Sequence, residues 1–386
     1  MVKKRIYLDY ASTTPLDKEV LRAMEPFLSE NFENPSSLYV EGVSAKKAVM
    51  GARKIIGNEL GVRAEEIIFT SSGTEANNTA LLGVFRSAKK KIAKPHVITT
   101  VIEHPSVLEV CKQIEREGGE VTYVSVRENG IVEAKEIKKA LKKNTVLVTI
   151  MYANNEIGTI QPISEIARVI RQFSKDSGVK IAFHTDASQA ANYLPLKVDS
   201  LGISMMTLDG SKIYGPKGVG VLYKKKEISI EPILFGGGQE GGIRSGTENV
   251  PGIVGMGKAV EICGKIRLSE FSRLTGLRDY LISGILKKFP KASLNGDLEK
   301  RLSNNVNICF QNLDAEFAVI KLDEAGIACA SASACNNLSE NPSSYVIGAL
   351  PEKERCKSSS LRFTLGRGTT KAELDKVLKI LPKALN

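Results

Sequence analysis

The chain has 386 residues, which predicts two compact domains, and its 42% hydrophobic and 25% charged residues are typical of a soluble globular protein. This composition argues against disorder, and no apolar run reaches the ~18 residues of a membrane helix, so we expect no membrane span. The 54 basic and 43 acidic residues give a net charge of +11. Because the lysine clusters are mixed with glutamates and lack interleaved aromatic residues, we interpret them as a solvated surface that favours acidic partners or anionic substrates. We expect no direct binding of nucleic acid.

The beginning of the chain and its cysteines indicate a cytoplasmic protein. Asp9 and the polar ASTT that follows Tyr10 interrupt any signal-like apolar core. The six cysteines are scattered without CxxC pairs, so we expect reduced thiols rather than a disulfide framework; they are Cys111, Cys263, Cys309, Cys329, Cys335 and Cys356.

Short β-branched runs alternate with amphipathic segments through the first 225 residues. This alternation predicts an α/β fold with a mainly parallel sheet covered by helices on both faces. The predicted strands are Ile67–Thr70, Val97–Ile102, Val121–Val126, Val146–Tyr152, Lys180–Thr185, Ile203–Leu208 and Val219–Tyr223. The clearest predicted helices are Ala76–Phe85, Ser106–Glu117, Ala134–Leu141 and Ile163–Phe173.

The pattern changes after the glycine-rich segment 235–252. Residues 255–290 are predicted to form one long helix, followed by a strand pair at Asn305–Phe310 and Ile327–Ser331. Thr370 and Glu373 form a capping box before a final helix. We therefore expect a smaller α+β domain made of residues 1–14 and 256–386 beside a large domain of residues 15–255.

Five predicted strands end in small, polar or ionisable residues. In an open α/β sheet the carboxyl ends of the strands line the ligand crevice, so these residues predict a site. The segments are SSGTEANN after Thr70, EHPSV after Ile102, ANNEIG after Tyr152, HTDASQ after Phe183 and DGSKIYGPKG after Leu208.

Each of these segments has a structural and a functional interpretation. Ser71–Thr74 is either a plain helix N-cap or a phosphate cup, and no nucleotide-binding glycine motif accompanies it. His104 either closes a strand or contacts a flat ligand and moves protons, whereas His96 is expected in the core. Asp186 is either a helix N-cap or a carboxylate paired with a cation or strong donor.

Lys212 lies between an apolar strand and a rigid, glycine-rich segment. It is either an exposed turn lysine or a lysine that forms a Schiff base. A phosphate cup, an aspartate and such a lysine together fit pyridoxal 5'-phosphate (PLP), with the lysine on the aldehyde and the aspartate on the pyridine nitrogen.

The motifs resemble the cysteine desulfurases of the class-V aminotransferase group, which have PLP fold type I. The resemblance runs nearly end to end through YLDYASTTP, NPSS, FTSSGTEANN, EHPSV, NNEIGTIQP, HTDASQ, KIYGPKGVG, GGGQEGGIRSGTEN, NNVN, SASAC and SLRFTLGR. It implies a large PLP-binding domain, a smaller domain with a catalytic-cysteine loop, and conversion of L-cysteine to L-alanine.

The resemblance also implies a role for individual residues. Lys212 binds the cofactor covalently, Asp186 binds its pyridine nitrogen, and His104 stacks on the ring and transfers protons. Arg362, with Asn155, binds the substrate, and Cys335 accepts sulfur as a persulfide. The ring hydroxyl contacts Asn155 and Gln189, the phosphate is held by Gly73, Thr74 and Ser211, and Thr247 reaches the phosphate of the neighbouring subunit in a homodimer. No metal is expected.

The Cys335 loop resembles the long-loop group, which implies an iron–sulfur scaffold protein or another sulfur acceptor, such as a tRNA-thiolation pathway, as partner. The chain departs from the family pattern at Tyr39, Asp209, Ser211, Ala332 and Ser358. Asp209 would repel a phosphate, so we expect it to turn away or to pair with a basic group.

Three other functions compete with the desulfurase. A class-V aminotransferase has no need of a nucleophilic cysteine, and a selenocysteine lyase would share most of these residues. A non-catalytic sulfur-transfer scaffold would need neither Lys212 nor Arg362, and both are present.

Overall fold

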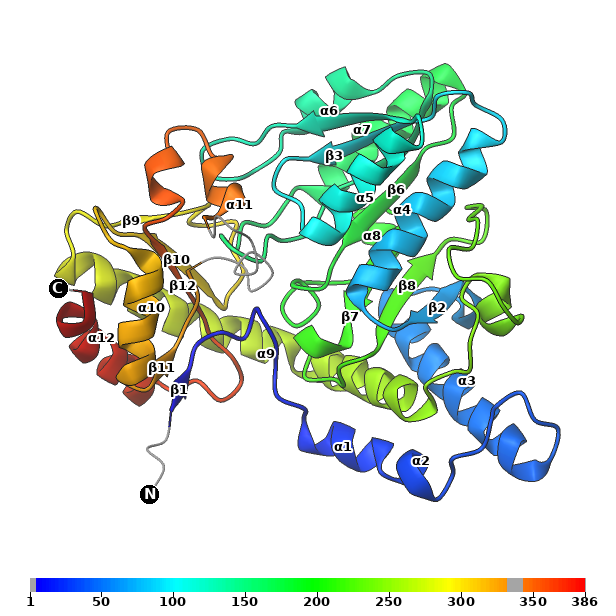
Figure 1. The fold of residues 1–386 in the computed structure, drawn as a ribbon, viewed down its shortest axis with the longest axis horizontal. Coiled ribbons are helices and arrows are strands. Elements are labelled where there is room, and N and C mark those ends of the chain that lie inside the picture. The colour runs from blue at the N-terminus through cyan, green and yellow to red at the C-terminus, as the bar shows by residue number, and fades with distance from the viewer. Residues whose placement is uncertain (1–4, 332–342, 386) are drawn as a thin grey trace.

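A seven-stranded sheet forms the centre of the larger unit in the computed structural model, which describes residues 5–331 and 343–385 (Figure 1). The strand order is β2-β8-β7-β6-β5-β3-β4, with β8 antiparallel to both neighbours and every other pair parallel. This confirms the predicted, mainly parallel α/β sheet. The strands are β2 (Ile67–Thr70), β3 (His96–Thr100), β4 (Glu120–Val124), β5 (Thr145–Thr149), β6 (Ala182–Asp186), β7 (Met205–Asp209) and β8 (Gly220–Lys224).

Helices cover both faces of this sheet because its strands are apolar on both sides. In β2, Ile67 and Phe69 join the core on one face while Ile68 joins a second core on the other. The second core packs against α4 (Gly73–Lys89) and α5 (Pro105–Arg116). The first packs against α3 (Val40–Leu60), α7 (Ile163–Ser177) and α9 (Val250–Lys288).

The smaller unit holds two short sheets. Strands β9 (Ser293–Leu294), β10 (Asn305–Cys309) and β12 (Ser360–Thr364) form an antiparallel sheet with β10 in the centre. The predicted pairing of 305–310 with 327–331 is wrong, because β11 (Ile327–Ala328) pairs in parallel with β1 (Ile6–Tyr7). Sequence spacing favoured neighbours in the chain, whereas the N-terminal strand takes that position in the fold.

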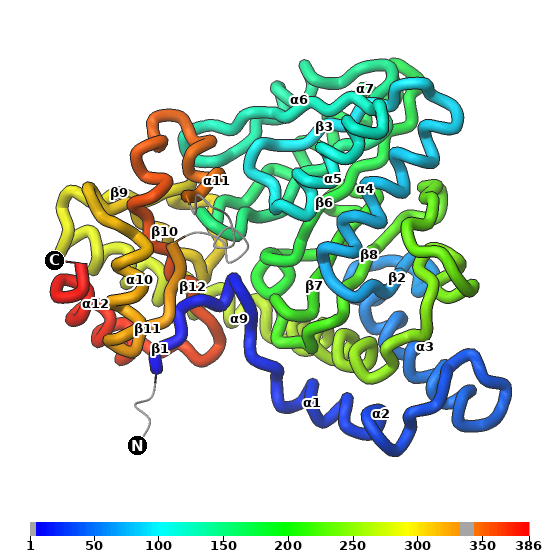
Figure 2. Tube along the Cα trace, in the orientation of Figure 1, coloured from blue at the N-terminus to red at the C-terminus, as the bar shows by residue number. Residues whose placement is uncertain are grey.

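The long helix α9 joins the two units, as the predicted helix over 255–290 anticipated. In Figure 1 it runs along one side of both units, and Figure 2 shows β1 and α12 (Lys371–Leu385) within the same smaller unit. The capping box is confirmed, since the Thr370 N–H donates to Glu373 Oε2 (3.0 Å) and the Glu373 N–H to Thr370 Oγ1 (3.3 Å).

The remaining helices are short and connect these layers. They are α1 (Lys18–Met24), α2 (Pro26–Ser29), α6 (Ala134–Ala140), α8 (Val198–Leu201), α10 (Ala315–Glu324) and α11 (Tyr345–Gly348), with 3-10 turns η1 (Ala64–Glu66), η2 (Gly210–Lys212), η3 (Gln239–Gly242) and η5 (Glu354–Cys356). Within the described ranges, no helix combines the length and apolarity needed to cross a membrane.

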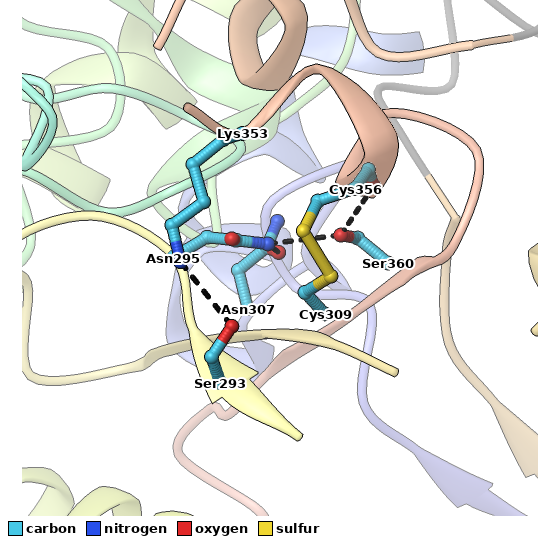
Figure 3. Close-up of a disulfide and its surroundings, with 7 residues drawn as sticks. All are labelled: Ser293, Asn295, Asn307, Cys309, Lys353, Cys356 and Ser360. Carbon is cyan, nitrogen blue, oxygen red and sulfur yellow. Dashed lines mark hydrogen bonds between the residues drawn. A yellow bond between two sulfur atoms is a disulfide. The ribbon is translucent and has the colours of Figure 1, made fainter. Parts of the chain in front are cut away.

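A disulfide joins Cys309 in β10 to Cys356 in η5, so the expectation of reduced thiols is wrong for this pair (Figure 3). The turn before β12 brings the two Cα atoms to 5.4 Å, a separation that a disulfide spans. Ser360 Oγ donates to the Cys356 carbonyl (2.7 Å) and accepts from Asn295 Nδ2 (2.9 Å), which fixes this turn. Cys111, Cys263 and Cys329 are free, buried thiols.

Candidate active site

A cavity of about 130 Å³ lies where the loops after β2, β3, β5, β6 and β7 meet the smaller unit. These are the strand ends that the sequence singled out. The cavity brings together eight of the predicted site residues, which are Gly73, Thr74, His104, Asn155, Asp186, Gln189, Lys212 and Arg362.

The Asp186 carboxylate is held by one donor on each oxygen. Oδ2 accepts from Asn77 Nδ2 (2.8 Å), and Oδ1 accepts from the Ser188 N–H (2.9 Å). Asp186 therefore does more than cap a turn with one oxygen, because its other oxygen is held by the side chain of Asn77. Each carboxylate oxygen can accept a further hydrogen bond, so Asp186 can also receive the N–H of a protonated pyridine ring.

His104 belongs to the same network. Asn77 Nδ2 donates to Ser106 Oγ (2.9 Å), and Ser106 Oγ lies 2.8 Å from His104 Nδ1. The Ser106 N–H also donates to Nδ1 (3.2 Å), so the proton of the neutral ring belongs on Nε2. Burial, with a smaller contribution from Lys212, lowers the pKa of His104. The ring is therefore neutral near pH 7 and can accept or donate a proton.

Lys212 ends a segment whose backbone leaves little freedom. The Gly210 N–H donates to the Val219 carbonyl (3.0 Å), and a Cβ on Gly210 would lie 2.6 Å from the Pro216 carbonyl oxygen. Only glycine allows this approach. The Lys212 amino group lines the cavity and donates to the Ser12 carbonyl, which rules out the exposed-turn interpretation.

Arg362 is 1% exposed and enters the cavity from β12. Its Nη2 pairs with Asp9 Oδ1 (2.7 Å) and donates to Ser12 Oγ (3.0 Å), while Nη1 donates to the Asn155 carbonyl (3.1 Å). These contacts fix the plane of the guanidinium, which suits a planar carboxylate.

Of the predicted site residues that the structure describes, Ser211 and Thr247 do not line this cavity. Ser211 is next to it, but its hydroxyl donates to Asp209 Oδ1 (2.7 Å). Thr247 is exposed on the surface, and Cys335 lies outside the described residues. The predicted roles of these three residues stay predictions.

Asp209 does not turn away, so that expectation is wrong. Its Oδ2 accepts from the Gly73 N–H (3.0 Å) and its Oδ1 from the Ser211 N–H (2.8 Å). The carboxylate finds one backbone donor at the start of α4, where the helix dipole favours an anion. Ser211 in η2 supplies a backbone and a hydroxyl donor, so Asp209 needs no basic partner.

Several residues of the site were missed in the sequence. Asn77 and Ser106 link Asp186 to His104, and Asp9 and Ser12 hold Arg362. Asn77 lies one helical turn after Gly73, a spacing that could have placed it on the cavity side of α4. Asp9 gave no such signal, because it meets Arg362 across 353 residues of sequence.

A buried carboxyl group next to His104 in the chain, Glu103, was also missed, and it accepts a hydrogen bond from Met151, which lines the cavity. Glu103 Oε1 accepts from Thr100 Oγ1 (2.7 Å) and the Met151 N–H (3.0 Å), and burial raises the pKa of Glu103 to about 8. His96 is in the core as predicted, between Thr145 and Thr122 at 2.8 Å each. Within the described ranges, no three His, Cys, Asp or Glu side chains lie together as metal ligands would.

Comparison with known proteins gives the class of this chain. The pattern of the class-V aminotransferases matches residues 6–377. A cysteine desulfurase IscS of Dictyoglomus turgidum is 44% identical over 384 residues, covering all of this chain and 95% of the relative. A cysteine desulfurase IscS of Methanosarcina thermophila is also 44% identical, over 98% of this chain and 92% of its own length.

Solved structures are similar to this chain as well. A NifS-like protein superimposes with a TM-score of 0.91 at 34% identity, covering 99% of both chains. SspA in complex with cysteine gives a TM-score of 0.79 at 36% identity, covering 93% of this chain and 98% of its own.

The chain therefore belongs to the class-V aminotransferase family, with PLP fold type I. Within that family it is a cysteine desulfurase, a PLP-dependent enzyme.

The residues present fit PLP at the ring end of the cavity. Asp186 has lone pairs for the pyridine nitrogen, and Asn155 Oδ1 is buried with no hydrogen-bond partner in the described part of the chain. A hydroxyl on the ring would satisfy this oxygen. At the phosphate end, Asp209 already accepts from the Gly73 N–H at the start of α4 and from the Ser211 N–H in η2.

Proposed function

We propose that this chain transfers sulfur from L-cysteine to Cys335 as a persulfide, releases L-alanine, and passes the sulfur to an acceptor such as an iron–sulfur scaffold protein. The observation that carries the proposal is the convergence of Lys212, Asp186, His104 and Arg362 on one cavity in a chain with full-length desulfurase relatives. PLP, when bound, supplies an electron sink for bond breaking at the substrate.

The chain's own residues divide the remaining work. Arg362 binds the carboxylate of cysteine through its fixed guanidinium, and Asn155 lies beside it. Lys212 holds the cofactor by its amino group, and Asp186 orients the ring. His104, neutral because it is buried, moves a proton at Nε2. Gly73, Thr74 and Ser211 hold the phosphate, and Gln189 contacts the ring hydroxyl.

The sulfur transfer balances without an outside oxidant. The Cys335 thiolate attacks the sulfur of the bound cysteine, the S–S bond forms as the C–S bond breaks, and the carbon takes up a proton to give alanine. The persulfide keeps the transferred sulfur until an acceptor or a reductant removes it.

Support for Cys335 comes from both sides of residues 332–342. Before this segment, the Ala330 N–H donates to the Arg362 carbonyl (3.1 Å); after it, the Tyr345 hydroxyl donates to the Glu103 carbonyl. The first contact involves Arg362, which lines the cavity, and the second involves Glu103, the residue before His104, which also lines it. Cys335 is four residues from Ser331, so the chain can span at most about 14 Å between them.

A homodimer is part of the same proposal. Large apolar side chains are exposed at Phe32 (74%), Leu38 (96%) and Phe235 (83%), more than single surface residues account for. A hollow of about 960 Å³ separates residues 35–36 from 238–241, and Glu248 also lines it. Thr247 precedes this hollow's lining residue Glu248 by one position in the chain, and we propose that it reaches the phosphate end of the second copy. Light scattering should give twice the 41.9 kDa chain mass.

We also propose that the chain divides into a large domain of residues 15–255 and a small domain of residues 1–14 and 256–386. We propose a cytoplasmic location as well. Among the alternatives, a selenocysteine lyase shares the site, and comparing alanine release from cysteine and selenocysteine separates the two.

Mapping the persulfide tests the proposed function. The holoenzyme is mixed with L-cysteine without reductant, thiols are blocked, and peptides are analysed by mass spectrometry. We expect one additional sulfur on the Cys335 peptide, and none in Cys335→Ser, which should keep its cofactor but release no sulfide. Cys111→Ala, in the core of the larger unit, serves as the control with unchanged sulfide release. Wild-type sulfide release by Cys335→Ser would rule out the persulfide at this residue.

A further inference from the structure

The start of α4 is filled by a side chain of the protein itself. Gly73 is the first residue of this 17-residue helix, and its N–H donates to Asp209 Oδ2 (3.0 Å). A Cβ on Gly73 would lie 3.1 Å from both Asp209 Cβ and Oδ2. The missing side chain thus makes the space in which the Asp209 carboxylate sits.

The carboxylate engages Gly73 and Ser211, two of the three residues that we propose hold the phosphate, while Thr74 also lines the cavity. Asp209 Oδ1 accepts from the Ser211 N–H (2.8 Å) and Oγ (2.7 Å), and Oδ2 takes the Gly73 N–H. Backbone N–H groups at a helix start, with a nearby hydroxyl, are the usual donors to a phosphate. The three donors of Gly73 and Ser211 are therefore engaged by one carboxylate.

The charged side chains around the start of α4 do not neutralise the Asp209 carboxylate. The second carboxylate at this helix end, Glu75, pairs with Arg244 (2.9 Å) and accepts from the Ser71 N–H (2.8 Å). Lys212 donates to the Ser12 carbonyl. Arg244 and Lys212 are thus already engaged, and a phosphate would meet a like charge at Asp209.

The position of this carboxylate relative to the ring end is consistent with a phosphate subsite. Asp209 and Gly73 line the same cavity as Asp186 and Lys212. A cofactor held at its pyridine nitrogen by Asp186 and at its aldehyde by Lys212 would direct its phosphate toward the remaining donors, at the start of α4.

We propose that Asp209 competes with the cofactor's phosphate for the start of α4 and thereby sets a weak, exchangeable affinity for PLP. The inference rests on the proposed function only in that the cavity takes PLP. Binding requires the Asp209 carboxylate to give up the Gly73 and Ser211 donors, so the phosphate adds little to affinity. A neutral side chain at position 209 leaves these donors to the phosphate.

Equilibrium binding of PLP and of pyridoxal, which lacks the phosphate, tests this inference. The holoenzyme is stripped of cofactor and titrated, with absorbance of the lysine-bound chromophore as the signal. The variants are Asp209→Ser, Asp209→Asn and, as a matched loss of one exposed carboxylate in α8, Asp199→Ser. We expect Asp209→Ser to bind PLP at least about tenfold more tightly than the wild type, since removal of a like charge nearby has an effect of this size or more.

Pyridoxal, inorganic phosphate and Asp199→Ser show whether a gain in PLP affinity comes from the phosphate end. We expect Asp209→Ser to leave pyridoxal affinity unchanged and Asp199→Ser to leave both affinities unchanged. Inorganic phosphate should raise the Tm of Asp209→Ser more than that of the wild type. If Asp209→Ser fails to fold, Asp209→Asn, which keeps the size of the side chain and one acceptor, carries the same comparison and should also favour PLP.

Two results would overturn the inference while leaving the desulfurase function intact. One is equal PLP affinity in the wild type and both Asp209 variants. The other is an equal gain for PLP and pyridoxal, because a gain without the phosphate cannot come from its subsite. Failure of every variant to bind either ligand would overturn the proposed function and this inference together.

Discussion

The two ends of the cavity are built on neighbouring strands but differ in how their donors are used. At the ring end, Asn77 and Ser188 hold Asp186 while leaving its oxygens able to accept more. At the phosphate end, Asp209 takes the donors of Gly73 and Ser211 for itself. The same backbone scaffold therefore prepares one end for a ligand and fills the other with a carboxylate. If our inference holds, this site keeps its chemistry while Asp209 lowers the affinity for its cofactor.

Lys212→Ala tests the ring end with the largest expected effect. Without the amino group the cofactor has no covalent attachment, so we expect loss of the long-wavelength absorbance and at least about a 10³-fold fall in kcat. Lys217→Ala changes an exposed lysine of the same glycine-rich segment, whose amino group donates to the Thr14 carbonyl, and should keep the absorbance. A Lys212→Ala protein that stays yellow would contradict the assignment.

Arg362→Lys tests the substrate side of the ring end. Lysine supplies one point charge instead of a planar fork held by Asp9 and Ser12, so we expect the KM for L-cysteine to rise about 10- to 100-fold. The absorbance of the bound cofactor should not change. Arg86→Lys, in a pair with Glu117 away from the cavity, is the control. An unchanged KM in Arg362→Lys would remove Arg362 from carboxylate binding.

Glu103→Gln tests the buried carboxyl group that accepts from Thr100 and Met151, and we expect its effect, which is on stability, to be the smallest of these. Since burial raises the pKa of Glu103 to about 8 from 4.5, the folded state binds a proton that the unfolded state releases. This group's contribution to stability is therefore present below pH 4.5 and is lost as the pH rises toward 8.

The variant has no such titration, and its amide oxygen can still accept from Thr100 and Met151. We expect its stability relative to wild type to increase by a few kcal/mol, on the order of the shift, between pH 5 and pH 8. Denaturant unfolding at several pH values measures this. A wild-type-minus-variant difference that stays constant over this range would show that Glu103 does not titrate as described.

The sequence was sufficient for the main sheet and most of the site. Strand β2 is where the pattern placed it, and alternation of Ile67, Ile68 and Phe69 accounts for its two buried faces. The lysine, aspartate and histidine follow strands whose ends meet at one edge, so their convergence could be predicted from topology alone.

The contacts that failed prediction depend on distant parts of the chain. β1 pairs with β11, and Asp9 meets Arg362, across more than 300 residues, so no local pattern carries this information. The Cys309–Cys356 disulfide depends on a turn before β12. The position of Asp209 required knowing that Gly73 leaves space for it, which a motif comparison based on charge did not supply.

The most direct test of the function adds L-cysteine and a reductant to the purified holoenzyme and quantifies alanine and sulfide while recording the visible spectrum. A cysteine desulfurase predicts a yellow protein that produces alanine and sulfide in equal amounts over many turnovers. A protein that binds PLP but forms neither product would contradict the account and favour a non-catalytic sulfur-transfer scaffold. Alanine formed without sulfide, or only with an added amino acceptor, would favour an aminotransferase.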